Sequence, residues 1–371
     1  MPDLDFIEAI KEALAPAHWN EARRDFLARL LVALLTAQTV CLSRLASLFP
    51  SQAKIASRYH RIRRFFGGFA FEASDLTDIV LRLAQQAGAK APFVLAFDRT
   101  EWKLGKTAIN IFLIGIVHGR VVFPLLWTML DKEGSSNTKE RIDLLARSVA
   151  LLGKERIAFV VGDREFASAG LLEWLCQEGI DFRLRLRQDI LLTDGNGQLV
   201  TAGWLFRRGA LGKEQMLVGR RECLGQQVFV SGMRFRNEKG KIEFLIVVSN
   251  GDRDKPACLA DYGLRWCIEN LFSGLKSRGF DLEATHLLDG ERLSRLVSVL
   301  TVAFCWSVAV GETAFAEQRQ AGKEPLRKGH GRLAISTFRY GLDLLRSLLA
   351  PLCGNYHKAG LLKACQILYG T

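Results

Sequence analysis

The chain has 371 residues, 49% of them hydrophobic and 24% charged, which is the composition of an ordinary soluble globular protein with room for two or three domains. Its net charge of +12 favours a polyanionic partner, although a basic protein without a nucleic-acid role is the alternative. The eight cysteines are scattered and form no Cys-x-x-Cys pair, which argues against a zinc or redox motif and for reduced thiols.

We expect a cytoplasmic protein without a membrane segment. Asp3, Asp5 and Glu8 stand where a signal peptide would need a basic start and an apolar run. The longest apolar run, residues 296–310, is shorter than the ~20 residues that a bilayer requires. We therefore interpret this run as a buried core helix.

Residues 1–88 predict a helical DNA-binding domain. Residues 42–49 and 52–66 have the pattern of two helices separated by Pro50, with Ser51 as the N-cap of the second. A short helix, a turn and a basic helix resemble a helix-turn-helix DNA reader, and a basic face of a helical bundle is the alternative. The cations that we expect to contact DNA are Lys54, Arg58, Arg61, Arg63 and Arg64.

Residues 89–188 predict a sheet with two aspartates where strands end. The expected order is three strands, a helix, a strand, a helix and a strand, at 93–97, 108–118, 121–127, 137–152, 156–161, 166–177 and 182–186. Asp98 follows the first strand and Asp163 the fourth, although either could be a turn residue or a helix cap. This order matches the ribonuclease H-like fold, in which carboxylates at these two strand ends meet one from a later helix.

The rest of the chain predicts an insertion, a return to the core and a helical end. Residues 189–251, with glycine-rich turns and alternating segments, indicate a β-rich insertion. In it, Trp204 is a candidate to stack on an unpaired base, with packing inside the insertion as the alternative. Residues 252–320 complete the core and 321–371 form a C-terminal helical region. The fold class is thus α/β, with a ribonuclease H-like catalytic core, a β-rich insertion and helical domains on both sides.

Residues 262–276 read as one helix with a polar face. At about 100° per residue, Arg265, Glu269 and Lys276 fall at about 300°, 340° and 320° from Tyr262. A phenol, a carboxylate and two cations then share one narrow face, which suits a site that binds a metal and an anionic ligand together. The alternative is an exposed face with an ordinary i,i+4 pair of Arg265 and Glu269.

The spacing of these four residues resembles the Tyr-Arg-Glu-Lys signature of bacterial insertion-sequence transposases of the insertion sequence family four type. In that family the glutamate is the last member of a DDE catalytic triad. Phe97-Asp98-Arg99-Thr100 is similar to the first box of the family, and Gly162-Asp163-Arg164-Glu165-Phe166 is similar to the second. The resemblance covers nearly the whole chain from about residue 42.

The resemblance implies a catalytic and metal-binding set of Asp98, Asp163 and Glu269, which would hold two divalent ions, Mg²⁺ or Mn²⁺. It makes Arg265 and Lys276 phosphate contacts and Tyr262 a contact to the DNA end. It also implies cut-and-paste transposition near the bacterial nucleoid, a homodimer in the synaptic complex, and terminal inverted repeats and target DNA as partners. If one member of the triad is misplaced, Asp163 is the first to question, with Glu165 as its replacement.

Two rival functions stay open on the sequence. A metal-dependent DNA nuclease on the same fold would cut without joining. A catalytically inactive DNA-binding repressor would keep the basic helices and bind without cutting. Whether a hairpin forms during end release is also open.

Overall fold

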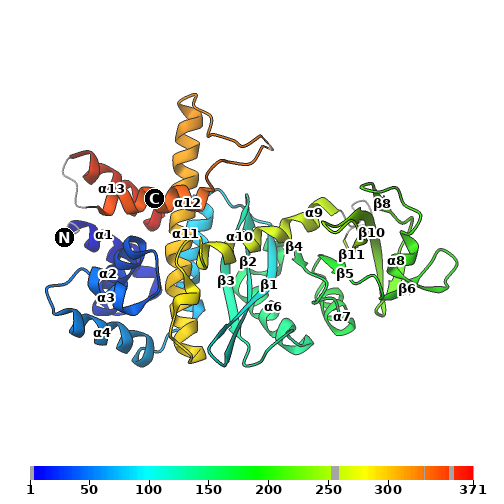
Figure 1. Ribbon diagram of the computed structural model, residues 1–371, viewed down its shortest axis with the longest axis horizontal. Helices are drawn as coiled ribbons and strands as arrows, with labels where there is room; N and C mark the ends of the chain where they lie inside the picture. Colours follow the sequence, from blue (N-terminus) through cyan, green and yellow to red (C-terminus); the bar gives the residue numbers. More distant parts are fainter. Residues whose placement is uncertain (1–3, 252–258, 330, 351–354, 371) are drawn as a thin grey trace.

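The computed structural model describes residues 4–251, 259–329, 331–350 and 355–370. Its centre is a mixed sheet, with helices at the N-terminal end of the chain packed to one side and further strands continuing the sheet to the other (Figure 1). The chain thus forms a mixed α/β protein.

Five helices make up the N-terminal region: α1 Leu4–Ala13, α2 Glu21–Ala37, α3 Leu42–Leu48, α4 Ile55–Gly68 and α5 Thr77–Gln86. Asn20 caps α2 by accepting a hydrogen bond from the Arg23 backbone N–H, so the predicted helical character has a local cause. The predicted cap at Ser51 is wrong, because α4 begins only at Ile55, after Lys54. The apolar face of α4 consists of Ile62, Phe65 and Phe66, all buried.

The first part of the sheet follows the predicted order closely: β1 Phe93–Leu104, β2 Thr107–His118, β3 Val121–Met129, α6 Thr138–Leu152, β4 Ile157–Gly162, α7 Ala169–Glu178 and β5 Phe182–Leu186. β1, β2 and β3 are antiparallel neighbours, whereas β4 and β5 continue parallel to β1. Asn137 caps α6 in a reciprocal pair with Glu140. α7 starts three residues later than expected and Ser168 precedes it, so Asp163 is not a helix cap.

Asp98 lies inside a strand and not at its end, which corrects the prediction. β1 is paired with β4 only through Ala96, opposite Val161, and then runs on to Leu104 against β2 alone. Asp98 therefore lies just past the point where β4 ends, and Asp163 follows β4 directly. The two aspartates meet for this reason, although only one of them is at a strand end.

The insertion extends the same sheet. Its elements are β6 Leu191–Thr193, β7 Leu199–Thr201, α8 Ala202–Leu205, β8 Glu214–Met216, β9 Arg221–Cys223, β10 Gln226–Arg236 and β11 Ile242–Ser249. β11 pairs antiparallel with β5, and the strand order is β3-β2-β1-β4-β5-β11-β10-β9-β6-β7, with β8 on β10. The predicted β-rich character of residues 189–251 is confirmed for these strands.

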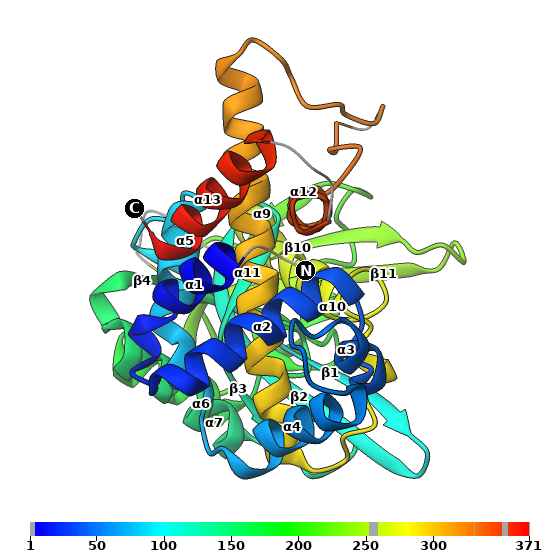
Figure 2. The same cartoon turned by 90° about the vertical axis from the view of Figure 1, so that its left-hand side faces the viewer.

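The last part of the chain contains α9 Leu259–Gly263, α10 Cys267–Leu275, α11 Gly290–Gln320, α12 Thr337–Leu349 and α13 Asn355–Tyr369. α11 runs through the middle of the molecule, between the N-terminal helices and the sheet (Figures 1 and 2). It is the one helix of the described residues with the length and apolarity of a membrane span, but 94% of its apolar stretch is buried inside the protein. The apolar run at 296–310 is thus part of a core helix.

One helix prediction needs correction. Residues 262–276 do not form one helix: a 3₁₀ turn at Leu264–Trp266 separates α9 from α10. The C-terminal region contains the helices α12 and α13, and residues 351–354 between them lie outside the described residues. The six described cysteines are free, as predicted, and Cys258 and Cys353 lie outside the described residues.

Candidate active site

Asp98 on β1 is the centre of a buried polar cluster. Its side chain is only 15% exposed. One carboxylate oxygen accepts a hydrogen bond from the backbone N–H of Arg99 at 2.8 Å, and the other accepts one from Arg265 at 3.0 Å. The strand and the turn before α10 together fix the position of this carboxylate.

Arg265 joins Asp98 to Glu269. Its Nη1 donates to Asp98, and its Nη2 donates to the Glu269 carboxylate at 2.7 Å. The Arg265 side chain is 7% exposed, whereas that of Glu269 is 57% exposed. The Nε of Arg265 is buried and has no hydrogen-bond partner among the described residues. The guanidinium therefore separates the two carboxylates and retains one unused donor.

Asp163 is held from two other elements. The hydroxyl of Tyr262 on α9 donates to it at 3.0 Å, and the Arg185 guanidinium on β5 lies 3.5 Å from the same oxygen. Tyr262 is fully buried, and burial raises the pKa of its phenol, so it remains a donor. Tyr262 was expected to contact a DNA end; in this structure it contacts Asp163.

The pKa values of the two aspartates are shifted in opposite directions. Burial raises the pKa of Asp98 to about 6, although the Arg99 backbone N–H and the Arg265 charge lower it. The neighbouring carboxylates of Asp163 and Glu165 raise it further. Asp98 therefore loses its proton less readily than an exposed aspartate does.

Burial also raises the pKa of Asp163, but other groups outweigh burial and leave this pKa below its ordinary value. These groups are the Arg164 backbone N–H, Arg265, the Tyr262 hydroxyl and Arg185. Asp163 is therefore the more readily ionised member of the pair.

Lys276 does not join this cluster. α10 ends at Leu275, and the Lys276 ammonium forms an ion pair with Glu283 at 2.8 Å. It also lies 5.0 Å from the ring centre of Trp102, which is farther along β1. The break between α9 and α10 and this helix end explain why the predicted common face holds for Tyr262, Arg265 and Glu269 but excludes Lys276.

The transposase DDE domain family matches residues 91–306, which is more than half of the chain. The chain belongs to this transposase family. No curated protein matches it. Membership implies an enzyme that cleaves and transfers DNA, and transposases of this family generally use divalent metal ions.

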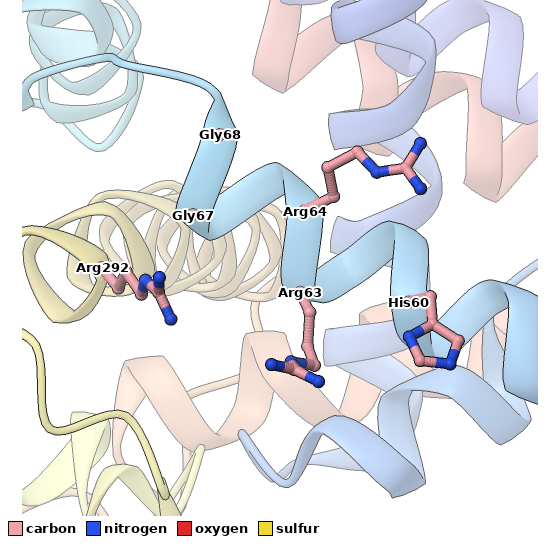
Figure 3. A pocket seen from close by; sticks show the side chains of 6 residues that line it. All are labelled: His60, Arg63, Arg64, Gly67, Gly68 and Arg292. Carbon is pink, nitrogen blue, oxygen red and sulfur yellow. The ribbon is translucent and has the colours of Figure 1, made fainter.

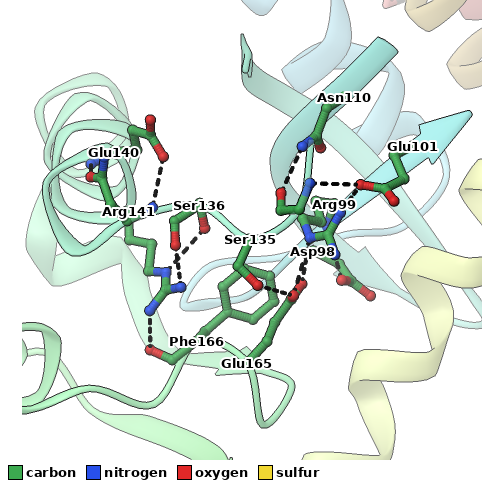
Figure 4. A network of polar contacts seen from close by, with 12 residues as sticks. Asp98, Arg99, Glu101, Asn110, Ser135, Ser136, Glu140, Arg141, Glu165 and Phe166 are labelled. Carbon is green, nitrogen blue, oxygen red and sulfur yellow. Dashed lines mark hydrogen bonds and ion pairs between the residues drawn. The ribbon is translucent and has the colours of Figure 1, made fainter. Parts of the chain in front are cut away.

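A second polar network of the transposase lies beside Asp98 (Figure 4). Arg99 donates to both carboxylate oxygens of Glu165, at 3.0 and 3.1 Å, and forms an ion pair with Glu101. Ser135 donates to Glu165 as well. Glu165 is therefore engaged with Arg99, whereas Asp163 is in contact with the Tyr262 and Arg265 side of the site.

The basic residues of α4 differ in their surroundings. Arg58 donates to the backbone carbonyl of Ala53 and is a structural contact, and Arg61 lies over the ring of Phe26. The remaining expected DNA contacts are exposed: Lys54, Arg63 and Arg64. Arg61 is exposed as well, so the exposed arginines of α4 are Arg61, Arg63 and Arg64, and the exposed Lys54 directly precedes the helix.

Trp204 in the insertion is 43% exposed. The guanidinium of Arg207 lies 3.4 Å from its ring centre, and Arg207 also donates to the Trp204 carbonyl. The indole is thus in contact with an arginine and remains partly exposed to solvent.

Sequence reasoning missed Arg185 and Arg99, which support Asp163 and Glu165. The alternation in residues 182–186, with arginine at every second position of an otherwise apolar strand, is the signal that could have revealed Arg185. A charged side chain pointing from a buried strand needs a partner. Arg99 gave no comparable signal.

The donor set fits a divalent cation in its chemistry. Asp98 and Asp163 offer hard carboxylate oxygens, and a cation bound beside Asp98 would favour its ionised form against the burial that raises its pKa. Glu269 faces Asp98 only across Arg265, and within the described ranges no three acidic, histidine or cysteine side chains already form a metal cage. Arg265 engages one oxygen of Glu269, so a cation at this carboxylate would bind the other oxygen or displace the guanidinium.

Proposed function

We propose that this transposase moves an insertion sequence by a cut-and-paste route. It cuts DNA at the terminal inverted repeats, releases each end, with a hairpin as one route, and joins the 3′ hydroxyls to target DNA. The observation that carries the proposal is the convergence of three carboxylates on Arg265. Asp98 and Glu269 bind its guanidinium directly, and its charge lowers the pKa of Asp163.

We infer a ribonuclease H-like core for the same reason. The strand order β3-β2-β1-β4-β5, antiparallel in its first three strands and parallel in its last three, supports that fold. In it, the insertion stands between β5 and the segment that carries Glu269. Helical residues 1–88 and 321–371 flank this core and complete the proposed domain organisation.

Asp98, Asp163 and Glu269 would hold two divalent ions, Mg²⁺ or Mn²⁺. When bound, such ions activate the attacking oxygen and stabilise the leaving one. Tyr262 holds Asp163 in place through its hydroxyl. Arg265, once Glu269 has left it, has donors available for a DNA phosphate, including the Nε that no described group uses.

The remaining roles concern DNA. Lys54, Arg63 and Arg64 contact the phosphate backbone, and Trp204 stacks on an unpaired base at the transposon end. Lys276 reaches a phosphate if it exchanges Glu283 for it, which the half-exposed ion pair permits. Two subunits bring two ends together, in the bacterial cytoplasm near the nucleoid.

The test is a cleavage and strand-transfer assay on DNA that carries the terminal repeats flanking the coding sequence, with Mg²⁺ or Mn²⁺. Glu269→Gln is compared with Glu173→Gln, because Glu173 is an exposed carboxylate on α7 that contacts only Gln177 among the described residues. We expect joined products from the wild type and from Glu173→Gln, and none from Glu269→Gln.

Each other outcome favours a specific rival. Cleavage without joining by the wild type supports a nuclease, and DNA binding without any cleavage supports a repressor. Cleavage that survives in Glu269→Gln refutes the assignment of the third carboxylate.

A further inference from the structure

A basic hollow lies between the C-terminal end of α4 and the start of α11 (Figure 3). Its volume is about 390 Å³. The lining consists of three arginines, one histidine and two glycines: Arg63, Arg64, Arg292, His60, Gly67 and Gly68. No acidic side chain lines it, so the hollow offers an anion several guanidinium donors from two helices.

The cations of the hollow are available to a ligand. Arg63, Arg64 and Arg292 are exposed, and none of the three forms an ion pair with a described residue. The acidic neighbour of Arg292, Glu291, is engaged with Arg295 at 2.8 Å. Figure 3 shows Arg63 and Arg292 extending toward the same side of α4, whereas Arg64 extends to the other side.

The backbone keeps this hollow open. An ideal Cβ placed on Gly67 would lie 3.4 Å from Nε of Arg292, and one placed on Gly68 would lie 3.7 Å from Cγ of Arg64. Any side chain longer than a methyl group at either glycine would occupy the space beside these guanidinium groups. The two glycines therefore leave room for a group from outside.

A buried contact fixes the two walls relative to each other. Arg295 on α11 is 9% exposed, and its Nη1 donates to the carbonyl of Phe66 on α4 at 2.7 Å. At the preceding residue of α11, Trp127 on β3 donates to the Ser294 hydroxyl at 2.9 Å. α4, α11 and the catalytic sheet are thus joined by short hydrogen bonds around the hollow.

We propose that this hollow binds a backbone phosphate of DNA, with Arg292 of α11 and Arg63 of α4 as its two donors. The proposal rests on the proposed function, because it takes DNA as the partner. A phosphate suits the site because arginine offers forked donors to its oxygens. Two further exposed cations are Arg61 on the same helix and Lys54 just before it. Arg292 thereby ties the DNA held by α4 to the helix that carries the catalytic core.

The test measures binding of a fluorescent ~20-base-pair duplex of arbitrary sequence in EDTA at several salt concentrations. Wild type is compared with Arg292→Gln, Arg292→Lys and Arg346→Gln; Arg346 is an exposed arginine of α12, far from α4 in both views (Figures 1 and 2). A phosphate contact contributes about 0.9 to the slope of log affinity against log salt. Thermal melts check that each variant is folded.

We expect Arg292→Gln to lower the salt slope by about 1 and the affinity at low salt by roughly fivefold to tenfold. Arg292→Lys should have the same salt slope as the wild type. Arg346→Gln should have the same salt slope and the same affinity at low salt as the wild type. The double variant Arg63→Gln with Arg292→Gln should lose less binding free energy than the sum of the losses in the two single variants, because both donors contact one phosphate.

Three outcomes overturn the inference in different ways. Wild-type binding with an unchanged slope in Arg292→Gln removes the phosphate site but leaves the proposed function standing. No salt-dependent binding by the wild type removes both. Binding of polyglutamate by the wild type but not by Arg292→Gln, with equal DNA binding, would assign the hollow to a protein partner instead.

Discussion

Replacing Asp98 with asparagine should inactivate the transposase and stabilise its fold. The side chain is 15% exposed, and burial raises its pKa from 3.8 to about 6. Because the folded chain holds this proton more tightly than the unfolded chain does, protonation stabilises the fold. That contribution is complete below about pH 4 and is lost as the pH rises through about 6.

The size of the effect follows from the shift. At about 1.4 kcal/mol per pKa unit, a change from 3.8 to about 6 corresponds to about 3 kcal/mol at pH 8. Asparagine resembles the protonated carboxyl group in shape, and its oxygen can still accept the hydrogen bond from Arg265. Asp98→Asn should therefore be more stable than the wild type by up to about 3 kcal/mol at pH 8 and equal to it at pH 4.

The assay is urea unfolding followed by tryptophan fluorescence between pH 4 and 8, with EDTA present so that no metal alters the carboxylate. Asp131→Asn, which changes an exposed aspartate in the turn after β3, is the matched control and should change nothing. The reasoning is refuted if Asp98→Asn is less stable than the wild type at pH 8, or if their difference does not vary with pH.

Three further predictions concern other sites. Tyr262→Phe removes the hydrogen bond to Asp163 and should lower the free energy of unfolding by about 1.5–3 kcal/mol near pH 7. This loss of stability should shrink as the pH falls through the lowered pKa of Asp163, and a pH-independent loss in urea unfolding would contradict the prediction. Gly341→Ala places a Cβ 1.8 Å from the Ser307 carbonyl oxygen, where α12 crosses α11, and should lower stability by ~1–3 kcal/mol or more in the same assay; an unchanged midpoint would show that the helices separate freely. Trp204→Ala should leave thermal stability unchanged but weaken binding of a DNA end with unpaired bases by ~1–3 kcal/mol. Fluorescence anisotropy should show no such loss of affinity for a blunt duplex, and equal losses of affinity for both DNAs would exclude stacking.

The sequence predicted the strands and most helices because their apolar periodicity and caps are local signals. Asn137 and its partner Glu140, three residues later, mark the start of α6 in both sequence and structure. The start of α4 was misplaced because a serine after proline is a common cap, yet Ser51 lies in the turn before the helix. The extension of β1 past Asp98 depends on β2, and no local pattern around Asp98 reveals that pairing.

The sequence identified candidate residues of the site but did not predict which of them contact one another. Helical spacing brings Arg265 and Glu269 together, and this pair exists. The same spacing placed Lys276 with them, but the helix ends one residue earlier and Glu283 binds the ammonium. The position of Arg265 between two carboxylates depends on how α10 packs against β1. This is a long-range contact, and the spacing of apolar residues in the sequence does not predict it.

The position of α11 has a consequence for synthesis of the chain. The N-terminal helices bury their apolar faces against α11, which begins more than 200 residues after α5 ends. At ~5–20 residues per second, the ribosome needs roughly 10–40 s to make that interval. During this time α4 and its cations have left the ribosome without the helix that completes their packing. α4 and the carboxylates Asp98, Asp163 and Glu269 thus reach their final arrangement together, when most of the chain has been made.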